Sequence, residues 1–241
     1  MNRLPNENNI LSVDAVIFDL DGTLIDSAPI YYELIDVIFT RLGIPPVSKE
    51  VLLEAMKDGE FEWDLVLPER LRPRKAEVIK TAQAIIDDIA PSMFSRDVKL
   101  IPGTVDVLNA IAAEGKKLAV ATSTLRDYMA VKLAPLNAAG IENLLEVIVT
   151  ADDVRHKKPH AEPLLKCSAM LGLDPMQCVY VGDTRVDIRA GNAAGMQTVG
   201  VLTGFDGYDA LKNENPTVII NSVADLRAPL ALGSPCALQD T

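Results

Sequence analysis

The stretch Asp14-Ala15-Val16-Ile17-Phe18-Asp19-Leu20-Asp21-Gly22-Thr23 passes from an apolar segment directly into two carboxylates. Residues 15–18 are too few for a stable helix, and their β-branched and aromatic side chains favour a strand buried on both faces of a parallel sheet. Asp19 then stands at the carboxyl end of this strand, where open α/β sheets bind ligands. Gly22 allows a sharp turn that brings backbone N–H groups toward an anion. An ordinary strand followed by an Asp-Gly turn has the same pattern, so this stretch alone leaves the presence of a site open.

Composition narrows the class of protein. The chain has 241 residues, of which 49% are hydrophobic and 24% charged, the balance of a soluble globular protein. We expect no secretion signal and no membrane span, because no leader pattern and no long apolar run is present. The net charge of −11 argues against a nucleic-acid surface and means that an anionic substrate needs a local cation, such as a metal ion. Three cysteines without metal-ligand spacing, Cys167, Cys178 and Cys236, favour a cytoplasmic location.

The first half of the chain after this strand is helical in pattern. Apolar residues recur at helical spacing over 29–42, 48–56 and 76–90, and Pro91 is expected to end the last of these helices. No strand signal occurs between residues 27 and 97, which is too long a run for a simple crossover between neighbouring strands. We therefore predict an inserted helical cap over 27–97. Residues 1–12 are predicted to be a flexible leader, and 229–241 a tail with no assigned role.

From residue 98 onward the pattern alternates between helix and strand. Strands are predicted at 118–121, 145–150, 178–181 and 198–201, with a further edge strand at 218–220. Helices are predicted from Thr104 to Gly115, over 125–137 with a kink or an earlier end caused by Pro135, and over 162–171 and 186–194. Such alternation predicts an α/β fold with a doubly wound parallel sheet, its core formed by 13–26 and 98–228.

Polar residues follow several of these strands where each one ends. Thr122 follows the second strand, Lys158 lies after the third, and Asp183 and Asp187 follow the fourth. Because the carboxyl ends of parallel strands meet at one edge of the sheet, we expect these residues to converge with Asp19 and Asp21. Each has an ordinary alternative when taken alone, since Thr and Asp commonly cap helices and Lys158 sits in a basic run.

The ordered set of motifs resembles the haloacid dehalogenase-like (HAD) hydrolases, most of which are phosphatases. The resemblance rests on Asp19-x-Asp21-Gly-Thr-Leu-x-Asp-Ser, on Thr122, on Lys158-Pro159 and on Gly182-Asp183-Thr184-x-x-Asp187, and it extends from about Val13 to Leu226. It implies a Rossmann-like HAD core. The inserted segment is similar to the helical cap of phosphoglycolate phosphatase and β-phosphoglucomutase.

The resemblance also implies roles for the acidic residues. Asp19 would be the nucleophile toward phosphorus. Mg2+ would be held by the side chains of Asp19 and Asp183 and by the backbone carbonyl of Asp21, as in the family, because hard cations prefer oxygen ligands. The side chain of Asp21 would protonate the leaving alcohol and then activate the water that opens the aspartyl phosphate.

The remaining candidates would bind the phosphoryl group. Thr122 and Lys158 would each hold a phosphoryl oxygen, with Lys158 also pairing with Asp19, and the N–H groups of Leu20 and Ser123 are further donors. Asp187 would support the site by positioning Lys158 or a metal-bound water.

The sequence therefore predicts a Mg2+-dependent phosphatase for a small phosphate ester, resembling phosphoglycolate or a sugar phosphate. A phosphomutase of the β-phosphoglucomutase type and a phosphonate hydrolase with a cap lysine, Lys49 or Lys57, are alternatives. A dehalogenase is less favoured, because it would not need Asp21 or the metal-binding carboxylates. A non-catalytic phosphate-binding module is least favoured, because Asp19 and Asp21 are both present. The identity of the metabolite and the oligomeric state stay open. Substrate selection is assigned to five residues of the irregular cap region, namely Lys57, Glu60, Trp63, Glu69 and Arg70.

Overall fold

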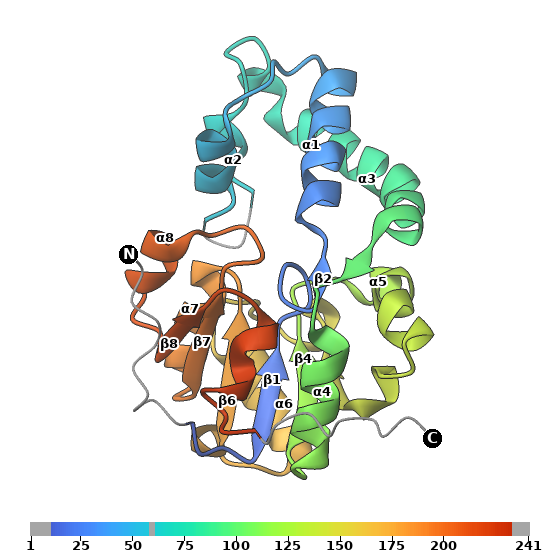
Figure 1. Cartoon of the computed structure of the whole chain (residues 1–241). Coiled ribbons are helices and arrows are strands. Elements are labelled where there is room, and N and C mark those ends of the chain that lie inside the picture. Colours follow the sequence, from blue (N-terminus) through green and yellow to red (C-terminus); the bar gives the residue numbers. More distant parts are fainter. Residues whose placement is uncertain (1–10, 58–60, 233–241) are drawn as a thin grey trace.

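The computed structural model describes residues 11–57 and 61–232. Its centre is a six-stranded parallel sheet with the order β5-β4-β1-β6-β7-β8 (Figure 1). The apolar residues 15–18, which precede Asp19, form β1. This strand lies between β4 and β6 and is buried along its whole length. The predicted doubly wound α/β architecture is confirmed, with the last strand at an edge. The strands are β1 (Ala15–Phe18), β4 (Lys117–Ala121), β5 (Leu145–Val149), β6 (Cys178–Gly182), β7 (Gln197–Val201) and β8 (Val218–Ile220).

Helices pack on both faces of this sheet. Alternate residues of β1 enter opposite hydrophobic clusters, because successive side chains of a strand point to opposite faces. Val16 and Phe18 pack in the cluster that contains apolar residues of α4 and α5, whereas Ala15 and Ile17 pack with those of α6 and α7. These helices are α4 (Thr104–Ala113), α5 (Arg126–Ala138), α6 (Glu162–Leu171) and α7 (Arg185–Ala193), followed by α8 (Tyr208–Lys212). Short 3-10 helices occur at Trp63–Leu65, Arg72–Arg74, Glu142–Leu144, Ala151–Asp153, Pro175–Gln177 and Val223–Arg227.

A separate group of helices lies beyond the carboxyl ends of the strands (Figure 1). We call residues 27–97, as far as they are described, the helical segment; it contains α1 (Ala28–Leu42), α2 (Lys49–Ala55) and α3 (Lys75–Asp97). This segment has its own hydrophobic cluster, in which α1 packs against α3. Its two connections to the sheet run side by side, because β2 (Ile25–Asp26) pairs antiparallel with β3 (Lys99–Leu100). The helical segment is thus placed directly over the edge at which Asp19 lies.

Local sequence explains the end of α1 and the start of α2, and tertiary packing explains one departure from expectation. Helix α1 ends at Gly43, which adopts the left-handed φ of 65° that favours glycine, and the Ser48 hydroxyl accepts the Val51 N–H at the start of α2. The prediction that the third helix ends at Pro91 is wrong, since α3 continues to Asp97. Proline removes only one helical hydrogen bond, and Met93 and Phe94 beyond it are buried in the hydrophobic cluster.

The described ends of the chain pack on the core. Leu11 is only 2% exposed, and its N–H donates to the Pro229 carbonyl at 2.7 Å, while Leu230 is buried nearby in the same cluster. The last residues of the predicted leader and the first of the predicted tail are therefore part of the folded core. The remainder, 1–10 and 233–241, lies outside the described residues, as does Cys236. Over the described ranges, no helix combines the length and the apolar character that crossing a bilayer requires.

Candidate active site

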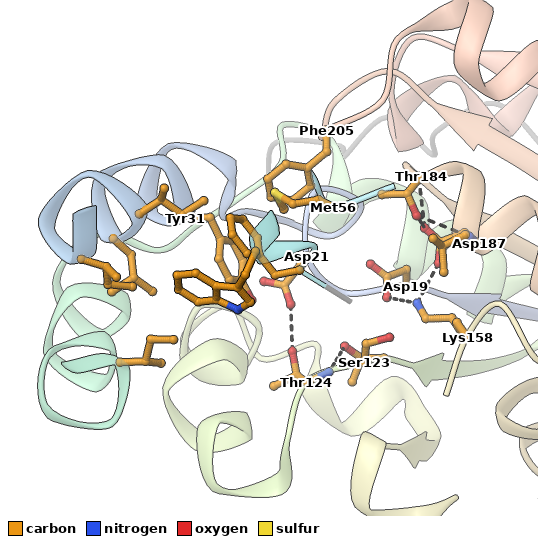
Figure 2. Close-up of a pocket in the computed structure, with 18 of the residues that line it drawn as sticks. Asp19, Asp21, Tyr31, Met56, Ser123, Thr124, Lys158, Thr184, Asp187 and Phe205 are labelled. Carbon is orange, nitrogen blue, oxygen red and sulfur yellow. Dashed lines mark hydrogen bonds and ion pairs between the residues drawn. The ribbon is translucent and has the colours of Figure 1, made fainter. Parts of the chain in front are cut away.

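Asp19 leaves the carboxyl end of β1 and meets a buried lysine. Lys158 Nζ lies 2.6 Å from Asp19 Oδ1 and 2.7 Å from Asp187 Oδ1 (Figure 2). It also lies 2.9 Å from the Tyr180 hydroxyl. These side chains come from β1, from the loop after β5, from the start of α7 and from β6. The parallel sheet thus brings together Asp19 and Asp187, which lie 168 positions apart in the sequence.

Both carboxylate oxygens of Asp187 are already engaged by protein donors. Oδ1 lies 2.7 Å from Lys158 Nζ and 3.0 Å from the Tyr180 hydroxyl. Oδ2 accepts the Thr184 N–H at 3.0 Å and the Thr184 hydroxyl at 2.6 Å, and together these residues form the capping box of α7. Asp187 therefore holds Lys158 in place and ties it to the start of a helix.

The site carries more negative charge than its lysine neutralises. Oxygens of Asp19, Asp183 and Asp187 lie within 4.8 Å of one another. Burial raises the pKa of Asp19 to about 7 although Lys158 opposes this shift, and burial followed by the nearby Asp187 and Asp19 raises the pKa of Asp183 well above its usual range. Burial alone would lower the pKa of Lys158, but Asp187 and Asp19 raise it, so the lysine stays charged.

This donor set fits a hard divalent cation. Asp19 and Asp183 supply carboxylate oxygens at a buried place with excess negative charge, and the oxygens of Asp187 are bound by other groups. The backbone approaches Asp183 closely: a Cβ built on Gly204 would lie 1.8 Å from Asp183 Oδ2, and one on Gly22, at φ +75°, would lie 2.5 Å from it. The Phe205 N–H, which lies 2.9 Å from the same oxygen, further fixes the carboxylate.

Asp21 points away from this cluster and into a second polar group. Its Oδ2 accepts the Thr124 hydroxyl at 2.9 Å and the Lys132 ammonium at 2.6 Å (Figure 2 shows the Asp21–Thr124 bond). Lys132 also donates to the Tyr31 hydroxyl at 2.6 Å. Burial and the Asp21 carboxylate raise the pKa of Tyr31 to about 12, so its hydroxyl keeps its proton. Asp21 Oδ1 is buried and has no hydrogen-bond partner among the described residues.

The predicted phosphate-binding residues differ in their surroundings. Thr122 is buried, and its Oγ1 accepts the Thr124 N–H at 3.1 Å, which leaves the hydroxyl proton able to donate to another group. Ser123 is exposed and lines the same cavity as Asp19 and Asp21. Leu20 buries its side chain in the core, and its carbonyl accepts the N–H groups of Leu24 and Ile25.

Sequence reasoning missed Tyr31, Thr124, Lys132 and Tyr180, which contact the predicted residues. Lys132 had a signal in the sequence: it is a single lysine on the buried face of α5, between Met129 and Leu136. Tyr180 lies inside an apolar strand, where its ring gives the pattern of an ordinary core residue.

A cavity of about 400 Å³ lies between this site and the helical segment. Of the residues predicted to select substrate, Trp63 lines the cavity. Lys57 instead pairs with Glu54, the Arg70 guanidinium donates to the Gly43 carbonyl, and Glu69 is exposed outside the cavity. Glu60 lies outside the described residues. These long polar side chains lie outside the cavity, because the faces that the helical segment turns toward the cavity are apolar.

An open parallel sheet with a carboxylate cluster and a buried lysine at its carboxyl edge, covered by inserted helices, is the arrangement expected of an α/β enzyme that transfers phosphoryl groups. Comparison with known proteins agrees. Residues 16–201 match the family profile of the haloacid dehalogenase-like hydrolases, and the chain belongs to this family. The resemblance inferred from the motifs, and with it the enzyme class of a HAD-like phosphatase, is confirmed.

Individual relatives support this assignment. The chain is 32% identical to a phosphoglycolate phosphatase of Salmonella paratyphi A, over 93% of this chain and 95% of that protein. Among solved structures, a predicted phosphoglycolate phosphatase from Haemophilus somnus superposes with a TM-score of 0.73 at 24% identity, over 89% of this chain and 96% of that chain. A HAD family hydrolase from Deinococcus radiodurans, with bound phosphate and sodium, gives a TM-score of 0.72 at 27% identity, over 92% and 96% of the two chains.

Proposed function

We propose that this protein is a Mg2+-dependent phosphatase that hydrolyses a small phosphorylated metabolite through an aspartyl phosphate on Asp19. The observation that carries the proposal is the position of Asp19 at the end of β1, 2.6 Å from a charged lysine and within a cluster of three carboxylates. Family membership supports it. The names of the relatives make phosphoglycolate the first candidate substrate, with sugar phosphates next.

The reaction divides between the two carboxylates that follow β1. Mg2+, held by Asp19, Asp183 and the Asp21 carbonyl, would offset the charge that keeps a carboxylate apart from a phosphate. Asp19 attacks phosphorus and the ester P–O bond breaks, while Asp21 gives a proton to the departing alkoxide. Asp21 Oδ1 suits this exchange because it has no partner among the described residues, whereas Oδ2 is held by Lys132 and Thr124. Asp21 then takes a proton from the water that attacks the aspartyl phosphate at phosphorus and releases phosphate.

The phosphoryl oxygens need donors around them during both steps. Lys158, the Thr122 hydroxyl and the N–H groups of Leu20 and Ser123 are assigned to this role. Asp187 acts through Lys158, since it lies 2.7 Å from Nζ and is fixed by the capping box of α7.

We assign residues 13–26 and 98–228 to a catalytic core and 27–97 to a cap. The short β2–β3 pairing supports this division because it brings the two connections of the helical segment side by side at the border of the core. Closure of the cap over a bound ester would exclude water from the reacting atoms.

Two alternatives use the same core. A phosphomutase would transfer the phosphoryl group back to its substrate, and no contact in the described residues favours it over hydrolysis. A phosphonate hydrolase needs a lysine of the helical segment in the cavity, but Lys49 lies over the Tyr32 ring and Lys57 pairs with Glu54, and neither lines the cavity. Hydrolysis is therefore the better-supported reaction.

Phosphate release from a panel of small esters in Mg2+ tests this function, with the native protein compared with Asp19→Asn and Asp21→Asn. The panel includes phosphoglycolate, sugar phosphates and ethyl phosphate. We expect turnover by the native protein and its loss in both variants. Isomerisation of a sugar phosphate without net phosphate release would instead identify a mutase, and binding of phosphate without turnover would identify a binding module.

We also propose a cytoplasmic location. Cys167 and Cys178 are buried and unpaired, and burial raises the pKa of both thiols, to about 12 and about 11. Such thiols are typical of a reducing compartment.

A further inference from the structure

The cavity next to Asp19 and Asp21 is apolar on the side that faces the departing alcohol. Figure 2 shows Tyr31, Met56 and Phe205 on one side of the site and Asp19, Lys158 and Asp187 on the other, with Asp21 between them. Apart from Tyr31, each lining residue from the helical segment is an aliphatic, sulfur-containing or aromatic hydrophobe: Leu34, Ile35, Ile38, Phe39, Met56, Phe61, Trp63 and Ile86. This wall offers a large hydrophobic surface and few polar atoms.

The same wall lacks a counter-ion. Among the described residues that line the cavity, Lys158 is the only lysine, arginine or histidine, and it already contacts the carboxylates of Asp19 and Asp187. Lys132 lies behind Asp21, is 2% exposed and donates to Asp21, Tyr31 and Thr124. The three positions 58–60 between the described ranges are Asp, Gly and Glu, so the sequence places no cation there.

A second anionic group on the substrate would therefore be poorly bound. It would leave water for an apolar wall in which the described lining residues offer it no cationic partner of its own. Burial of an unpaired carboxylate is among the most costly changes of environment in a protein. The phosphoryl group itself differs, because Lys158 and the carboxylates that would hold a metal ion lie at its end of the cavity.

The shape of the apolar wall suits a ring. Tyr31 and Phe205 meet edge to face with centroids 5.7 Å apart, and Phe61 and Trp63 do so at 4.9 Å. Aromatic side chains pack favourably against a further ring, and about 400 Å³ is within the range of small-molecule sites.

We propose that the leaving alcohol of the substrate is uncharged and largely apolar, of the size of an aromatic ring or a branched alkyl group, and carries no carboxylate. This inference rests on the proposed phosphatase function and revises its substrate class: the lining of the cavity favours an apolar ester over phosphoglycolate and sugar phosphates, the candidates taken from the names of the relatives. The apolar wall of the helical segment binds the alcohol while Asp21 protonates its oxygen. The preference for an apolar over a charged alcohol arises from the burial of apolar surface.

A matched pair of esters tests the inference directly. Benzyl phosphate and 4-carboxybenzyl phosphate share their reacting atoms and differ in one remote charge, and ethyl phosphate reports the chemistry without a large alcohol. With the native protein in Mg2+, we expect kcat/KM for benzyl phosphate to exceed that for 4-carboxybenzyl phosphate by on the order of 10²-fold. It should exceed that for ethyl phosphate by about tenfold or more.

Two isoleucines of α3 provide a matched control. Ile86 lines the cavity, whereas Ile79 is 36% exposed and lies outside it. Ile86→Ala should lower the ratio of benzyl to ethyl phosphate turnover by roughly tenfold, and Ile79→Ala should leave that ratio unchanged. Ile86→Lys places a cation in the wall and should raise turnover of 4-carboxybenzyl phosphate relative to benzyl phosphate. Thermal unfolding of each variant checks that it is folded.

The outcomes separate the inference from the function on which it rests. Equal or better turnover of 4-carboxybenzyl phosphate or phosphoglycolate, compared with benzyl phosphate, would overturn the inference and leave the phosphatase function standing. An unchanged substrate ratio in both folded Ile86 variants would also overturn it. No phosphate release from any ester, including ethyl phosphate, would overturn both.

Discussion

The Lys132 ammonium lies 2.6 Å from Asp21 Oδ2 and also donates to the Tyr31 hydroxyl of α1. It therefore links Asp21, the proposed general acid and base, to the helical segment. Burial alone would lower the pKa of Lys132, but Asp21 and then Tyr31 raise it above its usual range, so this lysine stays protonated. The ring faces of Phe94 and Tyr31 also lie near the ammonium, at 4.6 Å and 5.0 Å to their centroids. Lys132 thus couples the orientation of Asp21 to the position of α1.

Replacement of Lys132 should therefore affect both stability and chemistry. Lys132→Met leaves the Asp21 carboxylate without its buried partner, and we expect a loss of about 3 kcal/mol in the free energy of unfolding, measured by urea titration. We also expect kcat to fall by roughly tenfold or more, because Asp21 loses its fixed orientation. Lys80→Met, at an exposed position of α3, is the control and should change neither quantity. A destabilised variant with native kcat would show that Lys132 has a structural role alone.

The carboxylate cluster predicts an unusual dependence of stability on pH in the metal-free protein. The folded-state pKa of Asp19 is about 7 and that of Asp183 is well above its usual range, both above the ordinary value of 3.8. The stability contributed by Asp19 is therefore fully present below pH 3.8 and is lost as pH rises through about 7, and that contributed by Asp183 is lost as pH rises through its own raised pKa. Asp183→Asn removes one of the buried carboxylates, so at alkaline pH, where the cluster is ionised, it should raise the melting temperature in EDTA.

The same variant should respond differently to the metal. Addition of Mg2+ should raise the melting temperature of the native protein near neutral pH and have little effect on Asp183→Asn. Differential scanning fluorimetry in EDTA and in Mg2+ provides both comparisons. An Asp183→Asn protein that keeps the full Mg2+-dependent rise would exclude Asp183 as a ligand.

Close approach of the backbone to Asp183 gives a prediction that changes no charge. A Cβ at Gly204 would lie 1.8 Å from Asp183 Oδ2, whereas one at Gly207 would meet no heavy atom within 4 Å. Gly204→Ala must displace the carboxylate, and we expect the apparent affinity for Mg2+ to weaken by about tenfold or more. Gly207→Ala is the control and should bind Mg2+ as the native protein does. The Mg2+ dependence of phosphate release measures both, and equal affinities would show that the position of Asp183 is not critical.

The sheet could be predicted from sequence because each buried strand is a short apolar run, and a parallel sheet gathers the residues that follow its strands at one edge. This rule places Asp19, Lys158 and Asp187 together without any homologous structure. The extension of α3 beyond Pro91 could not be read locally, because Met93 and Phe94 bury themselves only in the presence of the other helices of the segment.

The composition of the cavity was the least predictable feature. The sequence predicts that polar residues of the helical segment face the substrate. Packing decides which helix faces are buried, however, and the hydrophobic faces of this segment lie toward the site as well as toward one another. The role of Lys132 could not be predicted for a related reason, because it depends on Tyr31 and Asp21, which lie 101 and 111 positions away in the sequence.

The central claim is that Asp19 carries the phosphoryl group, and trapping it there is the most direct test. Asp21→Asn should accept the phosphoryl group of 4-nitrophenyl phosphate, whose leaving group needs no proton, and should release it slowly for want of a base. After an acid quench and digestion with pepsin at low pH, mass spectrometry should find one phosphoryl group on Asp19. The Asp19→Asn, Asp21→Asn double variant should carry none. A phosphoryl group on another residue, or an unlabelled Asp21→Asn protein that still releases nitrophenol in the steady state, would contradict the account.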